Sequence, residues 1–375
     1  MAEKQTMSAR ERIERAINFQ EVYRVPIVDW IQHSGVIAHY AGVKERKNEW
    51  TKKEAAKAAR NALDMVQDIT PSYKPGIYET TYFNQSTTPS FGLGIRGVQG
   101  FKVKMDFWTY WIIERPFQDI EGLVKFIKKD IQQINKKLET TNWKEEERNF
   151  KRGYLLNQEL LGDTLQMYLV NVGLENAYNY ATLELFTYLY ADEPDLISEW
   201  LEVLNKQGVA YIDHFVTKEL YPWILIYSDI ASSDGLMFSP KFLREELIPR
   251  IKNLTKAAHN KGVKVIYHSE GYIMDILDDL ICAGVDGINP LEPLSNMSLE
   301  TVRKKYPKLI LWGGIDNTQL LPHGTTEEVK VAVERAIECA SKGGVLLGSS
   351  GQIHPACKLE NCITMIETIR KHKIA

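Results

Sequence analysis

The sequence predicts an α/β protein built as a (β/α)8 TIM barrel with an N-terminal helical extension and an aromatic-rich insertion. Three observations predict it: apolar runs alternate with helices in the C-terminal half, helix caps separate them, and polar side chains follow every run. Such alternation gives parallel strands joined by right-handed crossovers. A barrel needs polar groups after every strand, whereas an open doubly wound sheet gathers them at one switch point. No GxGxxG or Walker loop favours the open sheet.

The C-terminal half carries five expected barrel strands, at residues 224–227, 263–267, 287–288, 309–312 and 344–347. Helix signals lie between them. Ser239 and Pro240 begin one helix, which Pro249 divides, and Gly262 ends it. Two further helices are expected at residues 275–283 and 326–341, each followed by glycine. The chain is expected to form one barrel domain over residues 1–375.

The N-terminal half gives a weaker pattern. We expect an N-terminal helix within residues 1–24, a strand at 25–28, helices at 52–63 and 120–139, and a solvated charge run at 143–151. Residues 73–111 hold ten aromatics in 39 positions, which predicts hairpins and loops within an irregular insertion at 70–115. These aromatics either pack on themselves and the barrel rim or form the wall of an apolar substrate pocket.

Composition excludes several classes of protein. The 375 residues include 46 Lys and Arg against 49 Asp and Glu, a net charge of −3, which argues against nucleic-acid and membrane-surface partners. Hydrophobic residues make up 44% and charged residues 25%, an ordinary globular balance. The four cysteines show no disulfide framework, the N-terminus has no apolar leader, and no stretch approaches a membrane span. We therefore expect a cytoplasmic protein.

The sharpest local feature is His268-Ser269-Glu270, which follows an expected strand. Residues i and i+2 of a strand point to the same side, so the imidazole and the carboxylate converge. Such a pair can bind a divalent metal, share a proton as an acid/base pair, or only stiffen the rim through a hydrogen bond. The spacing alone does not distinguish these three roles of the His268–Glu270 pair. Asp229 ends the preceding apolar run and is expected at the same cavity, unless it caps the following loop.

Further candidates follow other expected strands. Lone His and Cys residues such as His33, His354 and Cys357 are more often structural, and Asp316 divides evenly between a site role and a cap. The expected substrate-binding side chains are Trp30, His33, Asn289, Asp316, Ser350 and His354.

Taken together, several segments resemble the uroporphyrinogen decarboxylase superfamily over nearly the whole chain. They are residues 11–26, the Asp229 to Gly235-Leu-Met-Phe-Ser-Pro240 segment, the Val263–Gly271 strand, which resembles the family's V-K-V-x-x-H-x-(C/D)-G strand, Trp312-Gly-Gly-Ile-Asp316, and residues 355–361. Each is weak alone, but in this order they are specific. The resemblance implies a barrel with its active site at the strand ends.

The family contains decarboxylases and corrinoid-dependent methyltransferases, and this sequence departs from both standard patterns. In the decarboxylases that this sequence resembles, arginines after the first strand bind a polyanionic tetrapyrrole. Here the corresponding residues 28–37 contain no arginine and place Asp29 beside Trp30. Methyltransferases acting on thiols carry H-x-C and a second Cys as zinc ligands. Here Glu270 and Ser350-Gly351 occupy those positions. A site of imidazole and carboxylate is harder and suits an ether or alcohol oxygen.

The resemblance therefore implies an O-demethylase-type methyltransferase of one-carbon metabolism. It would pass a methyl group from a methoxylated, aromatic substrate, or another C1 substrate, to the Co(I) corrinoid of a partner protein. The catalytic candidates are His268, Glu270 and Asp229, the first two as zinc ligands or as the acid that protonates the leaving oxygen. The alternatives are a decarboxylase using Arg96 or Arg115, a methylcorrinoid:thiol methyltransferase, and a barrel that only docks or reactivates a corrinoid protein. A homodimer remains open.

Overall fold

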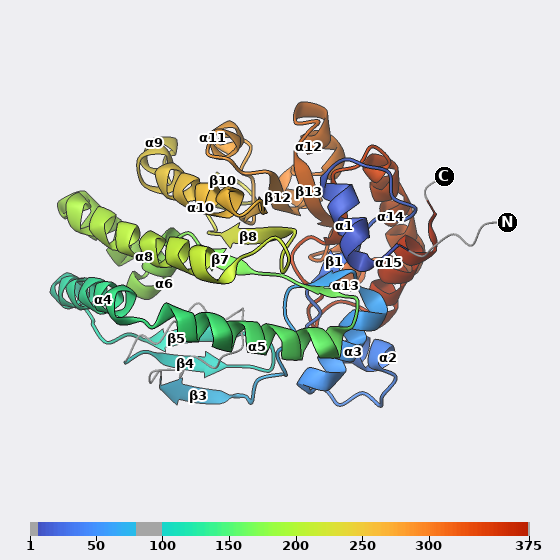
Figure 1. The fold of residues 1–375 in the computed structure, drawn as a ribbon, viewed down its shortest axis with the longest axis horizontal. Coiled ribbons are helices and arrows are strands. Elements are labelled where there is room, and N and C mark those ends of the chain that lie inside the picture. Colours follow the sequence, from blue (N-terminus) through green and yellow to red (C-terminus); the bar gives the residue numbers. More distant parts are fainter. Residues whose placement is uncertain (1–6, 80–99, 374–375) are drawn as a thin grey trace.

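The computed structural model describes residues 7–79 and 100–373, and its strands close into the expected (β/α)8 barrel (Figure 1). The barrel strands are β1 (Val28–Asp29), β2 (Met65–Val66), β6 (Leu165–Gln166) with β7 (Leu169–Asn171), β8 (Trp223–Tyr227), β11 (Lys264–His268), β12 (Gly287–Leu291), β13 (Ile310–Ile315) and β14 (Val345–Ser349). All the pairings are parallel, in the orders β1-β2-β6 and β7-β8-β11-β12-β13-β14. A parallel bridge between Ile27 and Leu347 closes the ring. The five strands expected in the C-terminal half are confirmed.

The barrel interior is packed rather than hollow. Inward side chains from the strands, including Trp223, Ile266 and Trp312, form one buried cluster. Helix α1 (Ala9–Ile17) adds Ile13 and Ile17 to this cluster. The Gly344 N–H, just before β14, donates to the Ala16 carbonyl at 2.8 Å. Because α1 closes the amino-terminal end of the strands, chemistry is restricted to their carboxyl ends.

Helices surround the sheet, and most begin where the sequence indicates. They are α2 (Ser34–Ala41), α3 (Lys52–Ala62), α4 (Ile120–Thr140), α5 (Trp143–Leu161), α6 (Leu174–Ala181), α7 (Leu183–Asp192), α8 (Pro194–Phe215), α9 (Pro240–Phe242), the π-turn η1 (Leu243–Leu247), α10 (Ile248–Asn260), α11 (Leu277–Cys282), the 3-10 turn η2 (Pro293–Ser295), α12 (Leu299–Lys305), α13 (Leu320–His323), α14 (Thr326–Ala340) and α15 (Leu359–Lys371). Ser239 caps α9, and Pro249 stands in the first turn of α10. The expected charge run at 143–151 is the first half of α5, which buries Tyr154 and Leu161 on one face. No helix in the described part of the chain is both long and apolar enough to cross a bilayer.

The aromatic-rich insertion is more regular than expected. Its described residues form an antiparallel sheet of β3 (Gly76–Glu79), β4 (Lys102–Met105) and β5 (Tyr110–Glu114), at the edge of the molecule opposite α9 to α12 (Figure 1). Residues 80–99, including Arg96, lie outside the described residues. The Gln32 side-chain amide donates to the Trp108 carbonyl at 2.9 Å, and the Tyr73 N–H donates to the Phe107 carbonyl at 2.8 Å. These bonds hold the β4–β5 turn against the carboxyl ends of β1 and β2.

Candidate active site at the barrel mouth

Four ionisable side chains meet at the carboxyl ends of neighbouring strands, and we call them the acid cluster: Glu175, Asp229, His268 and Glu270. His268 ends β11 and Asp229 follows β8, which pairs with β11 in register. The His268 Nε2 atom lies 3.8 Å from Asp229 Oδ1, with side-chain exposures of 22% and 35%. The structure therefore brings together all three predicted catalytic residues and adds Glu175.

A buried amide fixes the orientation of His268. The Asn289 Nδ2 group donates to the Trp312 carbonyl at 3.2 Å, so its Oδ1 atom faces His268 Nδ1 at 2.6 Å. An amide oxygen only accepts, so Nδ1 carries a proton. In the neutral imidazole Nε2 then keeps its lone pair, and in the charged form Nε2 presents a proton toward Asp229 and the barrel mouth. Asn289 was predicted to bind substrate, but the structure makes it the residue that positions His268.

Backbone hydrogen bonds hold the carboxylates in place. Asp229 Oδ1 accepts the Glu270 N–H at 2.9 Å, and the Asp229 N–H donates to Glu175 Oε2 at 3.3 Å. The Tyr178 hydroxyl donates to the Asp229 carbonyl at 3.1 Å. Asp229 therefore connects β11 on one side with α6 on the other, and it does not serve only as a cap.

Glu175 was missed in the sequence, although a signal for it exists. It stands in the first turn of α6, directly after the third barrel strand, and its N–H donates to the Ser228 hydroxyl at 3.0 Å. That strand is interrupted between β6 and β7, so its apolar run is short and it was not recognised. Glu292 was also missed. It follows β12, and its carboxylate accepts the Gly271 N–H at 2.6 Å.

Burial and mutual repulsion shift the acidities of the acid cluster. Burial, and next the Asp229 charge, raise the pKa of Glu175 to about 7. Burial and the Asp229 charge also raise the pKa of Glu270. Burial disfavours the imidazolium, but the charges of Asp229 and Glu270 outweigh it, so the pKa of His268 is raised. The cluster thus holds exchangeable protons near neutral pH, and they belong to the group rather than to one residue.

Gly271 allows the next loop to cover the cluster. Its φ is 84°, and a Cβ placed there would lie 2.4 Å from the Ser232 carbonyl oxygen. Ser232 belongs to the short hairpin of β9 (Ala231–Ser232) and β10 (Gly235–Leu236) that follows Asp229. Only glycine permits both the left-handed backbone and this close approach.

The expected zinc site is not preassembled. Within residues 7–79 and 100–373, no three His, Cys, Asp or Glu side chains are arranged to hold one metal ion. Asp229 Oδ1, which lies closest to His268 Nε2, already accepts the Glu270 N–H. Zinc therefore stays a prediction.

Three of the predicted substrate-binding residues have their polar groups engaged within the rim. Asp316 accepts the N–H groups of residues 318, 319 and 320, which makes it a cap. Ser350 is hydrogen-bonded twice to Asn317. His354 accepts the Ala356 N–H through Nδ1 and faces the Asn317 carbonyl through Nε2. In each case a hydrogen bond within the rim occupies the group that was assigned to substrate.

His33 is also structural. Its Nδ1 atom accepts the N–H groups of Gly35 and Val36 at the start of α2, and its Nε2 faces the Cys357 carbonyl at 3.0 Å. It is an N-cap, a role usually filled by Ser, Thr, Asp or Asn.

Neighbouring Asp29 is buried between β1 and β14, where it accepts the Ser349 N–H at 2.7 Å and the Ser349 hydroxyl at 2.9 Å. This bond locks the closure of the barrel.

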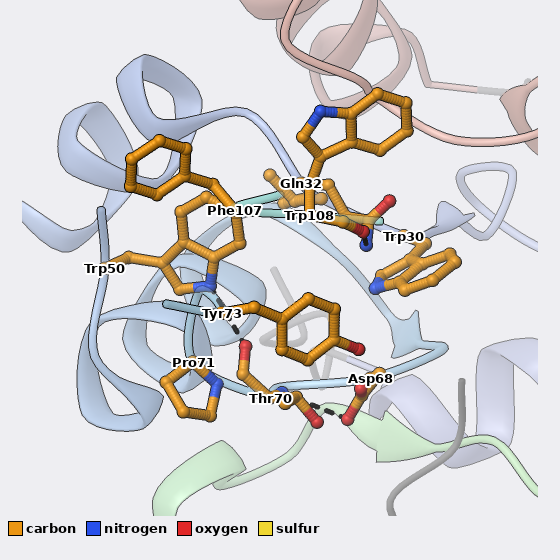
Figure 2. Close-up of a pocket in the computed structure, with 10 residues that line it drawn as sticks. Trp30, Gln32, Trp50, Asp68, Thr70, Pro71, Tyr73, Phe107 and Trp108 are labelled. Atoms are coloured by element: carbon orange, nitrogen blue, oxygen red, sulfur yellow. Dashed lines mark hydrogen bonds between the residues drawn. The ribbon is translucent and has the colours of Figure 1, made fainter. Parts of the chain in front are cut away.

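Trp30 lines a second feature of the mouth, a cavity of about 10 Å³ between the ends of β1 and β2 and the β4–β5 turn. We call it the aromatic notch, and its aromatic walls are Trp30, Trp50, Tyr73, Phe107 and Trp108 (Figure 2). Gln32 and Asp68 also line it. The insertion thus packs on the barrel rim, one of the two alternatives left open by its composition, and the wall of an apolar substrate pocket stays a prediction. Asp68 was not predicted as a site residue.

Comparison with known proteins places this geometry in a family. A methyltransferase from Methanosarcina mazei shares the fold, with a TM-score of 0.65, 16% identity, and 97% of this chain aligned to 99% of that one. A chitinase from Chromobacterium violaceum ATCC 12472 aligns with a TM-score of only 0.32, at 11% identity over 60% of this chain and 95% of its own. No curated protein matches by sequence.

The family model for uroporphyrinogen decarboxylase (URO-D) matches residues 164–372, over half of the chain and most of the barrel. The chain belongs to the uroporphyrinogen decarboxylase family.

Proposed function

We propose that this chain is a methyltransferase of the O-demethylase type, which moves the methyl group of a methoxylated, aromatic substrate to the Co(I) corrinoid of a partner protein. Family membership supports an enzyme with its site at the barrel mouth. The likeness to a methyltransferase with this fold supports the reaction class. The observation that carries the proposal is the acid cluster, with His268 fixed by Asn289 and proton-bearing groups near neutral pH.

The chemistry requires an acid because a phenolate or alkoxide leaves poorly. The partner protein's Co(I) corrinoid, as the second substrate, would supply the electron pair that forms the bond to the methyl carbon. The methyl–oxygen bond breaks, and its electron pair stays on the oxygen. In our proposal the His268 imidazolium gives its Nε2 proton to that oxygen, so the demethylated alcohol or phenol leaves neutral.

The other cluster residues keep this proton available. Asp229 faces Nε2 at 3.8 Å and stabilises the imidazolium. Glu175 is hydrogen-bonded to the Asp229 backbone and adds a second proton-bearing group with a pKa of about 7. Glu270 lies beside Asp229 and His268 at the mouth, where we expect it to accept a hydrogen bond from the substrate.

A decarboxylase would need cations for an anionic substrate. Arg115 donates to the backbone carbonyls of Tyr180 at 2.7 Å and Asn179 at 2.8 Å, so its guanidinium is engaged there. Carboxylates, not arginines, form the acid cluster. This composition favours the methyltransferase over the decarboxylase. The thiol methyltransferase ranks lower because Glu270 stands where that branch has a cysteine.

The test is methyl transfer in vitro. Purified protein, with and without zinc, is incubated with Co(I) corrinoid and a panel of methoxyarenes, methanol and methylamines, and the methylated corrinoid is followed by absorbance. We expect transfer from methoxyarenes that is lost in His268→Ala. Transfer that survives this substitution contradicts the role of His268, and no transfer from any donor contradicts the proposed function. Metal analysis of the purified protein tests the zinc expectation separately.

A further inference from the structure

The aromatic-rich insertion turns one face of its sheet toward the barrel. Along β5, Trp111 and Ile113 are 50% and 44% exposed. Tyr110 and Ile112, which alternate with them, pack against the main buried cluster. Because successive side chains of a strand lie on opposite faces, Tyr110 is on the inner face. It pairs with Met105 at the start of β5, next to the turn that is bonded to the carboxyl ends of β1 and β2.

Contacts with α6 bring this inner face to the acid cluster. Arg115, directly after β5, donates to the backbone carbonyls of Asn179 and Tyr180 near the end of α6. The Tyr180 ring also packs on Phe101, just before β4, with 5.5 Å between the ring centroids. The same helix carries Glu175 of the acid cluster in its first turn. The insertion therefore rests on the helix that supplies Glu175.

The Tyr110 hydroxyl lies beside the acid cluster. Burial raises its pKa, and the nearby Tyr227 hydroxyl and Glu175 carboxylate raise it further. Tyr227 ends β8 in register with His268 on β11, and both follow, by two residues, a side chain of the barrel's interior cluster. Tyr227 and His268 therefore point into the mouth side by side. One side chain, that of Tyr227, links Tyr110 to His268.

This hydroxyl is an unused hydrogen-bond donor. With its raised pKa it stays protonated and uncharged at neutral pH. Its neighbours act on it by charge alone, and no hydrogen bond within residues 7–79 and 100–373 involves it. The Tyr110 side chain is only partly buried. A tyrosine hydroxyl away from bulk solvent usually has a partner, so we expect an acceptor from outside the chain.

The surroundings select the kind of acceptor. The charge that acts most strongly on the hydroxyl is that of the Glu175 carboxylate. Asp68 adds a negative charge beside Tyr73, on the side of the aromatic notch (Figure 2). Both carboxylates disfavour an anionic acceptor and leave an uncharged oxygen as the matching group.

We propose that Tyr110 determines substrate specificity, because its hydroxyl donates a hydrogen bond to a second, uncharged oxygen substituent of the methoxylated ring. The preferred substrates are then uncharged arenes with at least two oxygen substituents. The inference rests on the proposed function in one respect, that the arene bound at the mouth is also the methyl donor.

The experiment is a calorimetric titration of the full chain, without corrinoid, with methoxyarenes. Anisole carries one ether oxygen, and the three dimethoxybenzene isomers carry a second one at different positions. After correction for two equivalent methoxy groups, we expect at least one isomer to bind about 3- to 10-fold more tightly than anisole, the gain from one neutral hydrogen bond. The same isomer with a ring carboxylate should bind more weakly than the uncharged compound.

One variant and one control assign the effect to the hydroxyl. Tyr110→Phe should remove the preference for the second oxygen and keep the affinity for anisole, which shows that the site is intact. Tyr188→Phe, on α7 with 57% exposure, is the matched control and should keep the preference. Circular dichroism checks the folding of both variants.

Three outcomes would overturn the inference. They are equal affinity for anisole and every dimethoxybenzene isomer, a preference that persists in Tyr110→Phe, and tighter binding of the carboxylate than of the uncharged isomer. Methyl transfer is measured separately, so the two failures differ. A preference that depends on Tyr110 without any transfer contradicts the proposed function, whereas transfer without this preference contradicts the present inference.

Discussion

Replacing Asn289 by Leu tests how the structure prepares His268 for proton transfer. The substitution keeps the approximate side-chain size and removes the acceptor that lies 2.6 Å from Nδ1. A hydrogen bond to a charged group contributes about 1.5–3 kcal/mol, and most of this is lost when the imidazolium forms without its partner. If the protonated form is required in the transition state, the rate should fall about 10- to 150-fold at fixed pH. Losing this bond also lowers the pKa of His268, so activity should disappear at a lower pH than in the unmodified chain.

The assay is initial-rate formation of methylated corrinoid from a methoxyarene across a pH series. Asn149→Leu on α5, whose side chain accepts from Arg152 of the same helix, is the matched control and should keep the unmodified rate. The reasoning is refuted if Asn289→Leu, folded by circular dichroism, keeps both the rate and the pH profile. A rate loss that is identical at every pH would also contradict it, because it would indicate damage unrelated to protonation.

Three further predictions follow from the same contacts. Glu175→Gln removes a negative charge that raises the pKa of His268, so the alkaline limb of the pH–rate profile should move to lower pH. An alkaline limb at the same pH would contradict an electrostatic interaction between Glu175 and His268. Burial raises the pKa of Asp29 to about 7, well above that of the carboxyl in the unfolded chain. The contribution of this carboxyl to the free energy of unfolding is therefore complete below about pH 4 and is lost as the pH rises toward 7. Urea unfolding should show this decline in the unmodified chain and a smaller decline in Asp29→Ala. Asp29→Ala should also cost about 1–3 kcal/mol at low pH, because the buried Ser349 N–H loses its acceptor. Gly271→Ala would place a Cβ 2.4 Å from the Ser232 carbonyl oxygen and push the β9–β10 hairpin away from the site. Activity should therefore fall at least about 10-fold while the far-UV circular dichroism spectrum is unchanged. Full activity would mean that the hairpin does not shape the site.

Sequence patterns predicted the barrel well where strands are long and apolar. β8, β11 and β14 are runs of five residues with clear caps around them, and the expected strands lie within two residues of their ends. The first half of the barrel was harder to recognise, because β1 and β2 are two residues each and β6 and β7 are separated pieces. Such strands are held by pairing and by the packed interior, not by a local pattern. Likewise, α5 was taken for a charge run because its buried face is narrow.

The site could be predicted only as far as strand spacing reaches. Register between β8 and β11 brings Asp229 and His268 together, and this follows from the parallel order of consecutive strands. Glu175 stands in the helix that follows the strand that was not recognised. Asp316 and His354 were assigned to substrate because a polar residue after a strand looks the same whether it binds a ligand or caps a turn. Only the hydrogen bonds of the folded chain distinguish these roles.

The central claim is that this barrel transfers a methyl group from oxygen to a corrinoid with a proton supplied by the acid cluster. The most direct measurement is a single turnover with a methoxyarene labelled as OCD3, with the corrinoid and the arene analysed by mass spectrometry. The account predicts equal amounts of CD3-labelled corrinoid and free phenol, with a rate that falls as pH rises through the range where the cluster loses its protons. Unlabelled corrinoid at every pH, or labelling that is unchanged in His268→Ala, would contradict it.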